Sequence, residues 1–211
     1  MHPTWWSTGH MIDRDIKQCL GQMMKGVEVV AARHDGITRA YTSHWVSQVS
    51  FAEPIVMASV SPRHDTYPLM IATGEFSVSI LAGDQVAEGQ YFSYPGRKFH
   101  RIAAEYLTDW PDDPAAPPVV VNSIAWLRCR IREEMPMQDH QLVFADVIAV
   151  EAVRLKEPPL LYSSRLGWRI AGDRAREPGT SIRDALLERV RDAGYDTDNR
   201  GASISDDESP R

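Results

Sequence analysis

The stretch that decides the fold is VEVVAARHDGITRAYTS, residues 27–43. Residues 27–32 are rich in valine and alanine and predict a strand, and residues 38–43 predict a second one. Between them, His34-Asp35-Gly36 supplies residues that tolerate the positive φ angles of a tight hairpin turn. The stretch therefore predicts an antiparallel β-hairpin and a core made of strands.

Further strands are predicted on the C-terminal side of this hairpin, because β-branched residues are frequent there. They cover residues 55–61, 76–81, 123–132, 142–155 and 160–162. Pro54 stands at the edge of the first of them, where its missing donor does no harm.

Short helices are predicted around the strands. Three of them cover about 14–25, 66–73 and 84–91. Gly26 ends the first of these helices, and Gly74 ends the second. A last helix starts at a capping box of Ser181 and Asp184 and runs to about residue 193. The helices are too short and too irregularly placed for a doubly wound parallel sheet. The sequence therefore predicts a mainly β barrel of the α+β class with short flanking helices.

Composition limits the classes of function. The chain has 211 residues, of which 43% are hydrophobic and 25% charged, as in a soluble globular protein. The formal net charge of −6 argues against nucleic acid as a partner. No apolar run approaches the length of a membrane span, and no secretory signal is visible, so a cytoplasmic protein without a membrane partner is expected.

The last sixteen residues, 196–211, are acidic, rich in serine and almost free of large apolar side chains. This composition is typical of a disordered tail. The two cysteines, Cys19 and Cys129, are too few for a disulfide framework and are expected to be small buried fillers.

Several catalytic signatures are absent. No Gly-x-Gly-x-x-Gly follows a strand, no phosphate-cradling P-loop is present, and no serine lies in a Gly-x-Ser-x-Gly elbow. The seven histidines form no pair with zinc-ligand spacing, so no metal site is predicted. Hydrolase and metalloenzyme interpretations are therefore weak.

The polar cluster TSHWVSQVS, residues 42–50, alternates hydroxyl, amide and bulky apolar side chains. Such a stretch suits a flat slot for a flavin ring, which needs polar groups along one edge and apolar cover on its face. Composition alone favours the other interpretation, a polar edge strand with one buried tryptophan.

Two more clusters have a functional and an ordinary interpretation. The segment SPRHDTY, residues 61–67, suits a phosphate group before a helix, although Ser, Asp and Thr are also common caps. The segment GRKF, residues 96–99, together with Asp139-His140, could close over a ligand, or its side chains could simply face solvent.

The order of these segments resembles that of the flavin reductases with an FMN-binding split barrel, a group that includes flavoredoxin-type proteins. The resemblance covers roughly residues 13–165. It is carried by Gly26-Val27 and the strand 28–32, TSHWVSQVSF at 42–51, PIV at 54–56, the helix 66–71, GEFSVSIL at 74–81, GRKF at 96–99, Asp139-His140 and PLLY at 159–162.

The resemblance implies a split β-barrel, Greek-key-like, and a set of site residues. The residues implied for the flavin ring and ribityl chain are Thr42, Ser43, His44, Trp45, Gln48 and Ser50. Ser61, Arg63 and Thr66 would take the phosphate, and Lys98 and Phe99 would close the far side. His140 matches the position where the nicotinamide approaches. The sequence departs from the family at Ser79, where Asn is usual, and at His44, where a small residue is common.

The implied activity is hydride transfer from NADH or NADPH to FMN, or to FAD, by a homodimer whose reduced flavin serves a partner monooxygenase. Two alternatives remain open: a non-enzymatic FMN-binding electron carrier, and a cofactor-free β-barrel binding module. The predicted organisation is an N-terminal arm (1–12), the FMN-binding domain (13–165), a helical extension (166–195) and the acidic tail (196–211).

Overall fold

The computed structural model describes residues 14–94, 103, 105–172 and 191–194. The chain divides into two units, one that ends at Gly172 and one that starts at Asp173. The site and the sheets lie in the first unit. The predicted C-terminal helix lies outside the described residues except for its last turn, and so does the acidic tail.

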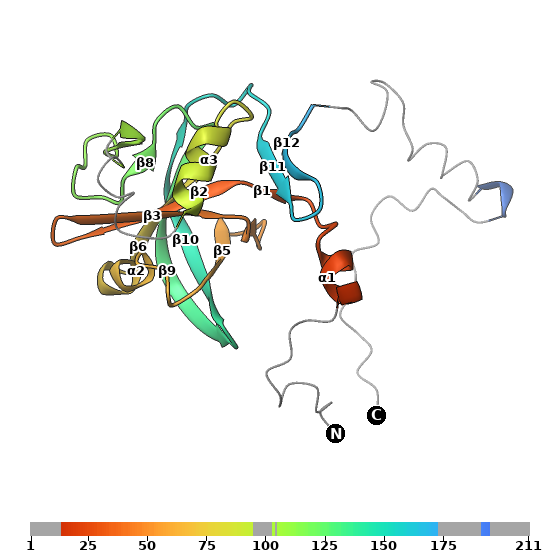
Figure 1. Cartoon of the computed structure of the whole chain (residues 1–211), viewed down its shortest axis with the longest axis horizontal. Coiled ribbons are helices and arrows are strands. Elements are labelled where there is room, and N and C mark those ends of the chain that lie inside the picture. Colours follow the sequence, from red (N-terminus) through yellow and green to blue (C-terminus); the bar gives the residue numbers. More distant parts are fainter. Residues whose placement is uncertain (1–13, 95–102, 104, 173–190, 195–211) are drawn as a thin grey trace. The chain divides into compact units, whose positions relative to one another are not determined.

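The first unit consists mainly of antiparallel strands (Figure 1). Its described helices are α1 (Arg14–Leu20), α2 (Tyr67–Thr73) and α3 (Val86–Ser93). Its strands are β1 (Lys25–Gly26), β2 (Glu28–His34), β3 (Ile37–Ser43), β4 (Val46–Gln48), β5 (Ile55–Val60), β6 (Glu75–Ile80), β7 (Leu107–Thr108), β8 (Val119–Val120), β9 (Ala125–Met137), β10 (His140–Ala152), β11 (Leu160–Ser163) and β12 (Gly167–Ile170).

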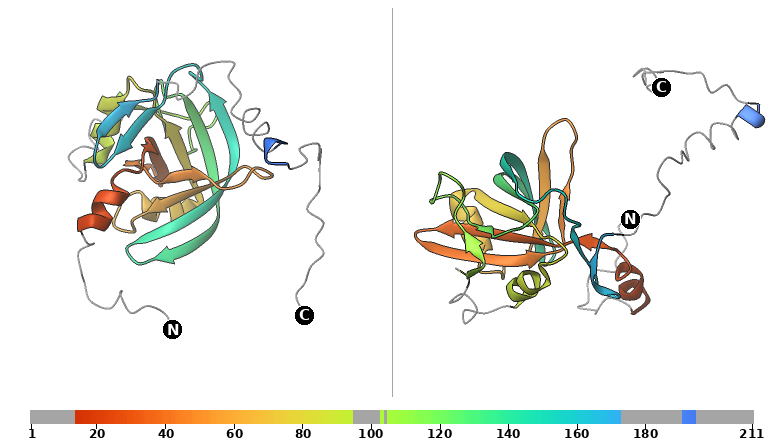
Figure 2. Two further views of the ribbon diagram at one scale, coloured as in Figure 1. Left: turned by 90° about the vertical axis from the view of Figure 1, so that its right-hand side faces the viewer. Right: turned by 90° about the horizontal axis from the view of Figure 1, so that it is seen from above.

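The main sheet has the strand order β3-β2-β6-β9-β10-β5-β4. Its two edge strands, β3 and β4, are consecutive in the chain and are separated only by His44 and Trp45. Because such a link reaches at most about 11 Å, the two edges of the sheet must come together at this corner. The sheet is thus curled into a half-barrel, which Figure 2 shows from two sides, and the predicted split β-barrel is confirmed.

The predicted hairpin is also confirmed. β2 and β3 pair from Glu28 with Ser43 to His34 with Ile37. The turn between them places Asp35 at φ 49° and Gly36 at φ 73°. These left-handed values suit glycine and are tolerated by aspartate, so the local sequence fixes the register of the first two strands.

The two larger apolar clusters of the described residues pack on the two faces of β2. One fills the inside of the curled sheet and includes Val30, Phe76, Val78 and Val143, all of them almost fully buried. The other lies between β2 and α3 and includes Val29 and other residues that α3, β8 and β11 contribute. Successive residues of β2 therefore face the two clusters in turn, as the two-residue period of a strand requires.

The structure differs from the sequence prediction at the first helix. α1 ends at Leu20, not near residue 25, and Lys25-Gly26 pairs with β11 as strand β1. A Cβ at position 21 would come within 3.1 Å of the Lys17 carbonyl oxygen, so Gly21 is suited to the turn that follows α1. Pairing with a distant strand, which local sequence does not reveal, then sets the conformation of residues 25–26.

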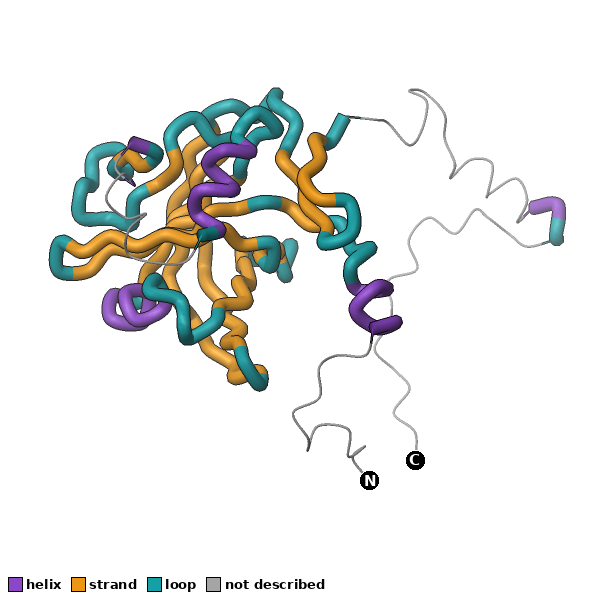
Figure 3. Tube along the Cα trace, in the orientation of Figure 1, coloured by secondary structure: helices purple, strands orange, loops and turns teal. Residues whose placement is uncertain are grey.

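Helices α2 and α3 flank the main sheet (Figure 3). α2 packs against β2 and β6, and α3 packs against β3 and β2. None of the helices in the described residues has the length and apolar character needed to cross a bilayer.

Candidate functional site

A groove lies beside the corner where the two edges of the main sheet meet. Its larger part, the main lobe, has a volume of about 740 Å³. The main lobe is lined by residues from the segment before β2, from the β3–β4 corner, from the outer face of β5 and from the β9–β10 hairpin. These residues are Met23, Met24, Lys25, Gly26, His44, Trp45, Val46, Ser47, Met57, Ser59, Met137, Asp139 and His140.

A second, smaller part, the polar lobe, has a volume of about 330 Å³. It is lined by Arg63 and by residues 136–141 of the β9–β10 hairpin, which include two glutamines. Met137, Asp139 and His140 line both lobes, so the two lobes lie next to each other. The groove therefore places a region rich in methionine beside a region that carries the guanidinium group of Arg63.

His140 stands at the junction of the two lobes. The Nδ1 atom of its ring lies 3.0 Å from Oδ1 of Asp139. The ring of Trp45 meets it edge-on, with centroids 5.0 Å apart and planes inclined by 68°. The hydrogen bond from His140 lowers the pKa of Asp139, and the positive charge of Arg63 acts in the same direction.

His44 is held at the other side of the main lobe by aromatic contacts. Its ring stacks on Tyr162 of β11 with centroids 4.3 Å apart, and Trp168 of β12 meets it edge-on at 5.8 Å. Burial lowers the pKa of His44, so the imidazole is neutral near pH 7. The residue is larger than the family pattern suggests, and strands β11 and β12 accommodate it.

Three residues were implied for binding the phosphate: Ser61, Arg63 and Thr66. Of these, Arg63 lines the groove. Arg63 is exposed and lines the polar lobe. The hydroxyl of Ser61 accepts a hydrogen bond from the backbone N–H of Arg63 at 3.4 Å. Thr66 is almost fully buried at the start of α2, and its side chain makes no capping hydrogen bond.

Four other predicted residues make hydrogen bonds within the protein and do not line the groove. Thr42 donates its hydroxyl hydrogen to the Gly89 carbonyl oxygen of α3 at 2.6 Å. Ser43 is buried and accepts a hydrogen bond from the Trp45 N–H. The side chains of Gln48 and Ser50 bond within the 48–53 turn. Lys98 and Phe99 lie outside the described residues.

Sequence reasoning missed most of the apolar lining of the main lobe. Its four methionines come from three separate segments, and no local pattern links them. A signal was present in β5, where Met57 and Ser59 alternate with the buried Val56, Ala58 and Val60 and therefore share the opposite face.

A second cleft, of about 620 Å³, lies between the β2–β3 hairpin and residues 103–118. Arg33 and Arg39 line it, but Arg33 is already paired with Asp109 at 2.7 Å. Of the predicted site residues in the described part of the chain, none lines this cleft. The groove is therefore the better candidate.

Comparison with known proteins agrees with the fold. The sequence model of the flavin reductase like domain matches residues 20–166. The reductase component of 4-hydroxyphenylacetate 3-monooxygenase from Thermus thermophilus is 35% identical over 155 residues, which cover 72% of this chain and 93% of that protein. The chain therefore belongs to the flavin reductase family.

Other relatives have related names. The NADH:riboflavin 5'-phosphate oxidoreductase of Streptomyces pristinaespiralis is 28% identical over 153 residues, 72% of this chain and 85% of that one. The crystal structure of nitrilotriacetate monooxygenase component B from Mycobacterium thermoresistibile superimposes with a TM-score of 0.68 at 22% identity, covering 82% of this chain and 93% of that chain. An NADH:FAD oxidoreductase of Streptomyces globisporus gives a TM-score of 0.67 at 19% identity, covering 79% and 99%. At these identities the solved structures support the fold.

Proposed function

We propose that this protein is an NAD(P)H:flavin oxidoreductase that reduces FMN in the groove and supplies reduced flavin to a partner oxygenase. The observation that carries the proposal is that the two lobes lie next to each other and share Met137, Asp139 and His140, in a member of the flavin reductase family. The main lobe has the size of a cofactor pocket and offers methionine and tryptophan side chains to a flat ring. The names of the relatives support the same hydride donor and oxygenase partner.

The residues fit the two ends of FMN. Trp45 and Met57 offer apolar contact for the isoalloxazine ring, and Ser47 and Ser59 offer hydroxyl groups for its polar edge. Arg63 in the polar lobe supplies the charge that a phosphate needs. When bound, the flavin accepts a hydride from the reduced nicotinamide and takes up a proton from solvent. The protein contributes binding, orientation and exclusion of water.

Anaerobic stopped-flow mixing of the FMN-loaded protein with NADH and with NADPH tests this function. Bleaching of the flavin absorbance within a turnover is expected with at least one of them. A yellow protein that neither dinucleotide reduces would instead be an FMN-binding electron carrier. A colourless protein that fails to take up FMN would be the cofactor-free binding module.

The assignment of the phosphate to Arg63 gives a sharper prediction. Arg63→Ala should weaken FMN binding by roughly tenfold or more and leave riboflavin binding nearly unchanged, because only FMN carries the phosphate. Fluorescence titration with both ligands measures this. Arg39→Ala, in the second cleft, is the matched control and should change neither affinity. Equal weakening of both ligands by Arg63→Ala would contradict the assignment.

We also propose a homodimer in the cytoplasm. Exposed apolar side chains surround the groove, including Met23 at 56% and Trp45 at 49% exposure, and such patches often mark subunit contacts. Light scattering should give twice the mass of the chain, and a monomer at micromolar concentration would contradict this.

The FMN-binding domain at 13–165 also remains a proposal, although β12 continues the pairing beyond it.

A further inference from the structure

Methionine is concentrated in one part of the molecule, the main lobe of the groove. Of the methionines that the structure describes, Met23, Met24, Met57 and Met137 line this lobe, whereas Met70 and Met135 do not. Three of the lining side chains, Met23, Met24 and Met137, are between 42% and 56% exposed. Solvent and small solutes therefore reach a cluster of thioether groups in the place where the flavin is proposed to bind.

A thioether group has two properties that matter in such a place. It packs favourably against an aromatic ring, and its lack of branching lets it adapt to the shape of a ligand. It is also oxidised to a sulfoxide, which turns a flexible apolar side chain into a polar one and disrupts apolar contacts. A methionine that holds a flat ring by apolar contact therefore loses much of that contact when it is oxidised.

We propose that Met23, Met24 and Met137 form a redox-sensitive modification site, at which oxidation to sulfoxide by hydrogen peroxide lowers the affinity of the groove for flavin. The proposal rests on the proposed function, because that function supplies the oxidant. Dioxygen takes two electrons and two protons from reduced flavin that no oxygenase has collected, and it becomes hydrogen peroxide. A protein that produces more reduced flavin than its partner uses would then bind less flavin.

The oxidation needs no reactant besides the peroxide. A lone pair of the sulfur attacks one peroxide oxygen, so that an S–O bond forms while the O–O bond breaks. The sulfur gives up two electrons, and the peroxide accepts them. The proton of the transferred hydroxyl group passes to the departing hydroxide, which leaves as water. Each sulfoxide therefore consumes one peroxide.

Strand β9 contains a matched control. Met135 and Met137 have the same exposure, 42%, and they lie on the same face of the strand because they are two residues apart. Met137 lines both lobes of the groove, and Met135 lines neither. Peroxide should therefore oxidise both side chains to a similar extent, but only the sulfoxide at Met137 should affect the flavin.

Peroxide treatment of the purified full chain tests the proposal. Catalase then removes the peroxide, peptide mass spectrometry locates the sulfoxides, and fluorescence titration gives Kd for FMN before and after treatment. Treatment should raise the Kd of the wild type by about tenfold, because part of the apolar contact is lost. The Met135→Leu variant should show the same rise.

A variant that combines Met23→Leu, Met24→Leu and Met137→Leu separates the groove from the rest of the chain. Leucine is apolar and of similar volume, and it is not oxidised by peroxide. Treatment should leave the Kd of this variant unchanged, although Met135 and the exposed Cys19 are still present. Methionine sulfoxide reductases, one for each epimer of the sulfoxide, should restore the original Kd of the treated wild type.

A rise in Kd of the triple variant equal to that of the wild type would assign the effect to another residue and overturn the proposal. The proposal is also overturned if the three methionines resist peroxide, or if their sulfoxides leave the Kd of the wild type unchanged. Failure of the untreated wild type to bind FMN would reject the proposed function itself, whereas the comparison of treated with untreated protein concerns the methionines alone.

Discussion

Glu28 places a half-buried carboxyl group beside Gly26, a residue that lines the groove. It is the first residue of β2 and lies opposite Ser43 of β3 and Ile80 of β6. Its Oε2 atom is shielded from solvent and has no hydrogen-bond partner among the described residues. Burial raises the pKa of Glu28 to about 8, so the folded protein holds this carboxyl group protonated at neutral pH.

This shift makes stability depend on pH. At pH values between 4.5, the ordinary pKa of a glutamate side chain, and about 8, Glu28 is ionised in the unfolded chain but protonated in the folded one. Unfolding therefore releases a proton, and its free energy falls as pH rises through this window. The contribution is on the order of 3–5 kcal/mol by pH 8. Glutamine does not titrate, so the Glu28→Gln variant lacks this pH-dependent contribution. Its free energy of unfolding should therefore increase relative to that of the wild type as pH rises from about 5 to 8.

Urea unfolding at several pH values measures the difference. Comparison with wild type cancels the other titrating groups, so the pH dependence of the difference belongs to position 28. Glu133→Gln, which changes an exposed glutamate of β9, should show almost no pH-dependent difference. A difference for Glu28→Gln that stays constant with pH would mean that the carboxyl group is ionised in the folded protein.

The sequence predicts single residues of the site only in part. Of the site residues that the resemblance implies, His44, Trp45, Arg63 and His140 line the groove in the described structure, and their roles stay predictions. It could not show that the Thr42 hydroxyl bonds to α3, because that contact depends on a helix 47 residues away. Glu28 gave no signal, since its burial follows from the pairing of β2 between two strands.

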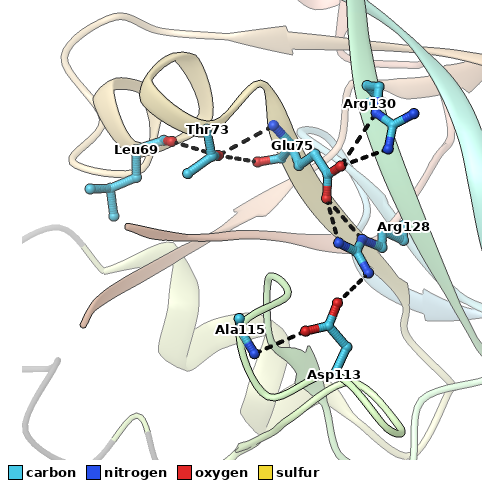
Figure 4. A network of polar contacts seen from close by, with 7 residues as sticks. All are labelled: Leu69, Thr73, Glu75, Asp113, Ala115, Arg128 and Arg130. Atoms are coloured by element: carbon cyan, nitrogen blue, oxygen red, sulfur yellow. Dashed lines mark hydrogen bonds and ion pairs between the residues drawn. The ribbon is translucent and has the colours of Figure 1, made fainter. Parts of the chain in front are cut away.

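At the scale of elements, one ionic network ties a loop to two central strands (Figure 4). Glu75, at the start of β6, contacts Arg128 of β9 at 2.8 Å and Arg130 of the same strand at 3.1 Å. Arg128 also contacts Asp113, in the loop between β7 and β8, at 2.7 Å. Glu75 and Arg128 are mostly buried, with side chains 17% and 22% exposed.

Loss of the central carboxylate should therefore destabilise the sheet. Glu75→Ala leaves Arg128 with one carboxylate partner in a partly buried place and should cost about 2 kcal/mol of unfolding free energy. Arg130→Ala removes a guanidinium group that is 62% exposed and should cost less than about 1 kcal/mol. Urea unfolding compares them, and equal losses would show that burial of the pair is unimportant.

Elements with strong local patterns were predicted well, and elements defined by distant pairing were not. β2, β3, β5 and β6 were predicted within two residues, because β-branched runs and the Asp35-Gly36 turn mark them. The short strands β1, β7, β8 and β12 were missed, since two to four residues carry no period. The Gln138-Asp139 turn was not recognised as a hairpin between β9 and β10, because neither residue is a glycine.

At the scale of the whole first unit, the groove brings together segments that are far apart in the chain. Residues 23–26, 44–47 and 137–140 all contribute to its lining. They belong to the segment before β2, to the corner between the two sheet edges and to the β9–β10 hairpin. A ligand in the groove would therefore contact three separate segments of the half-barrel at once, while the central strands β2 and β6 lie in the core.

Binding of FMN should therefore slow amide hydrogen exchange in all three segments at once, because the bound state must release the ligand before any of them opens. At a free FMN concentration of about 100 times Kd the bound state gains roughly 2.7 kcal/mol, which corresponds to about a hundredfold slowing. Exchange at 33–39, beside the second cleft, should not change. Protection confined to one segment would mean that the lobes do not act as a single site, and protection at 33–39 would move the flavin to the cleft of Arg33 and Arg39.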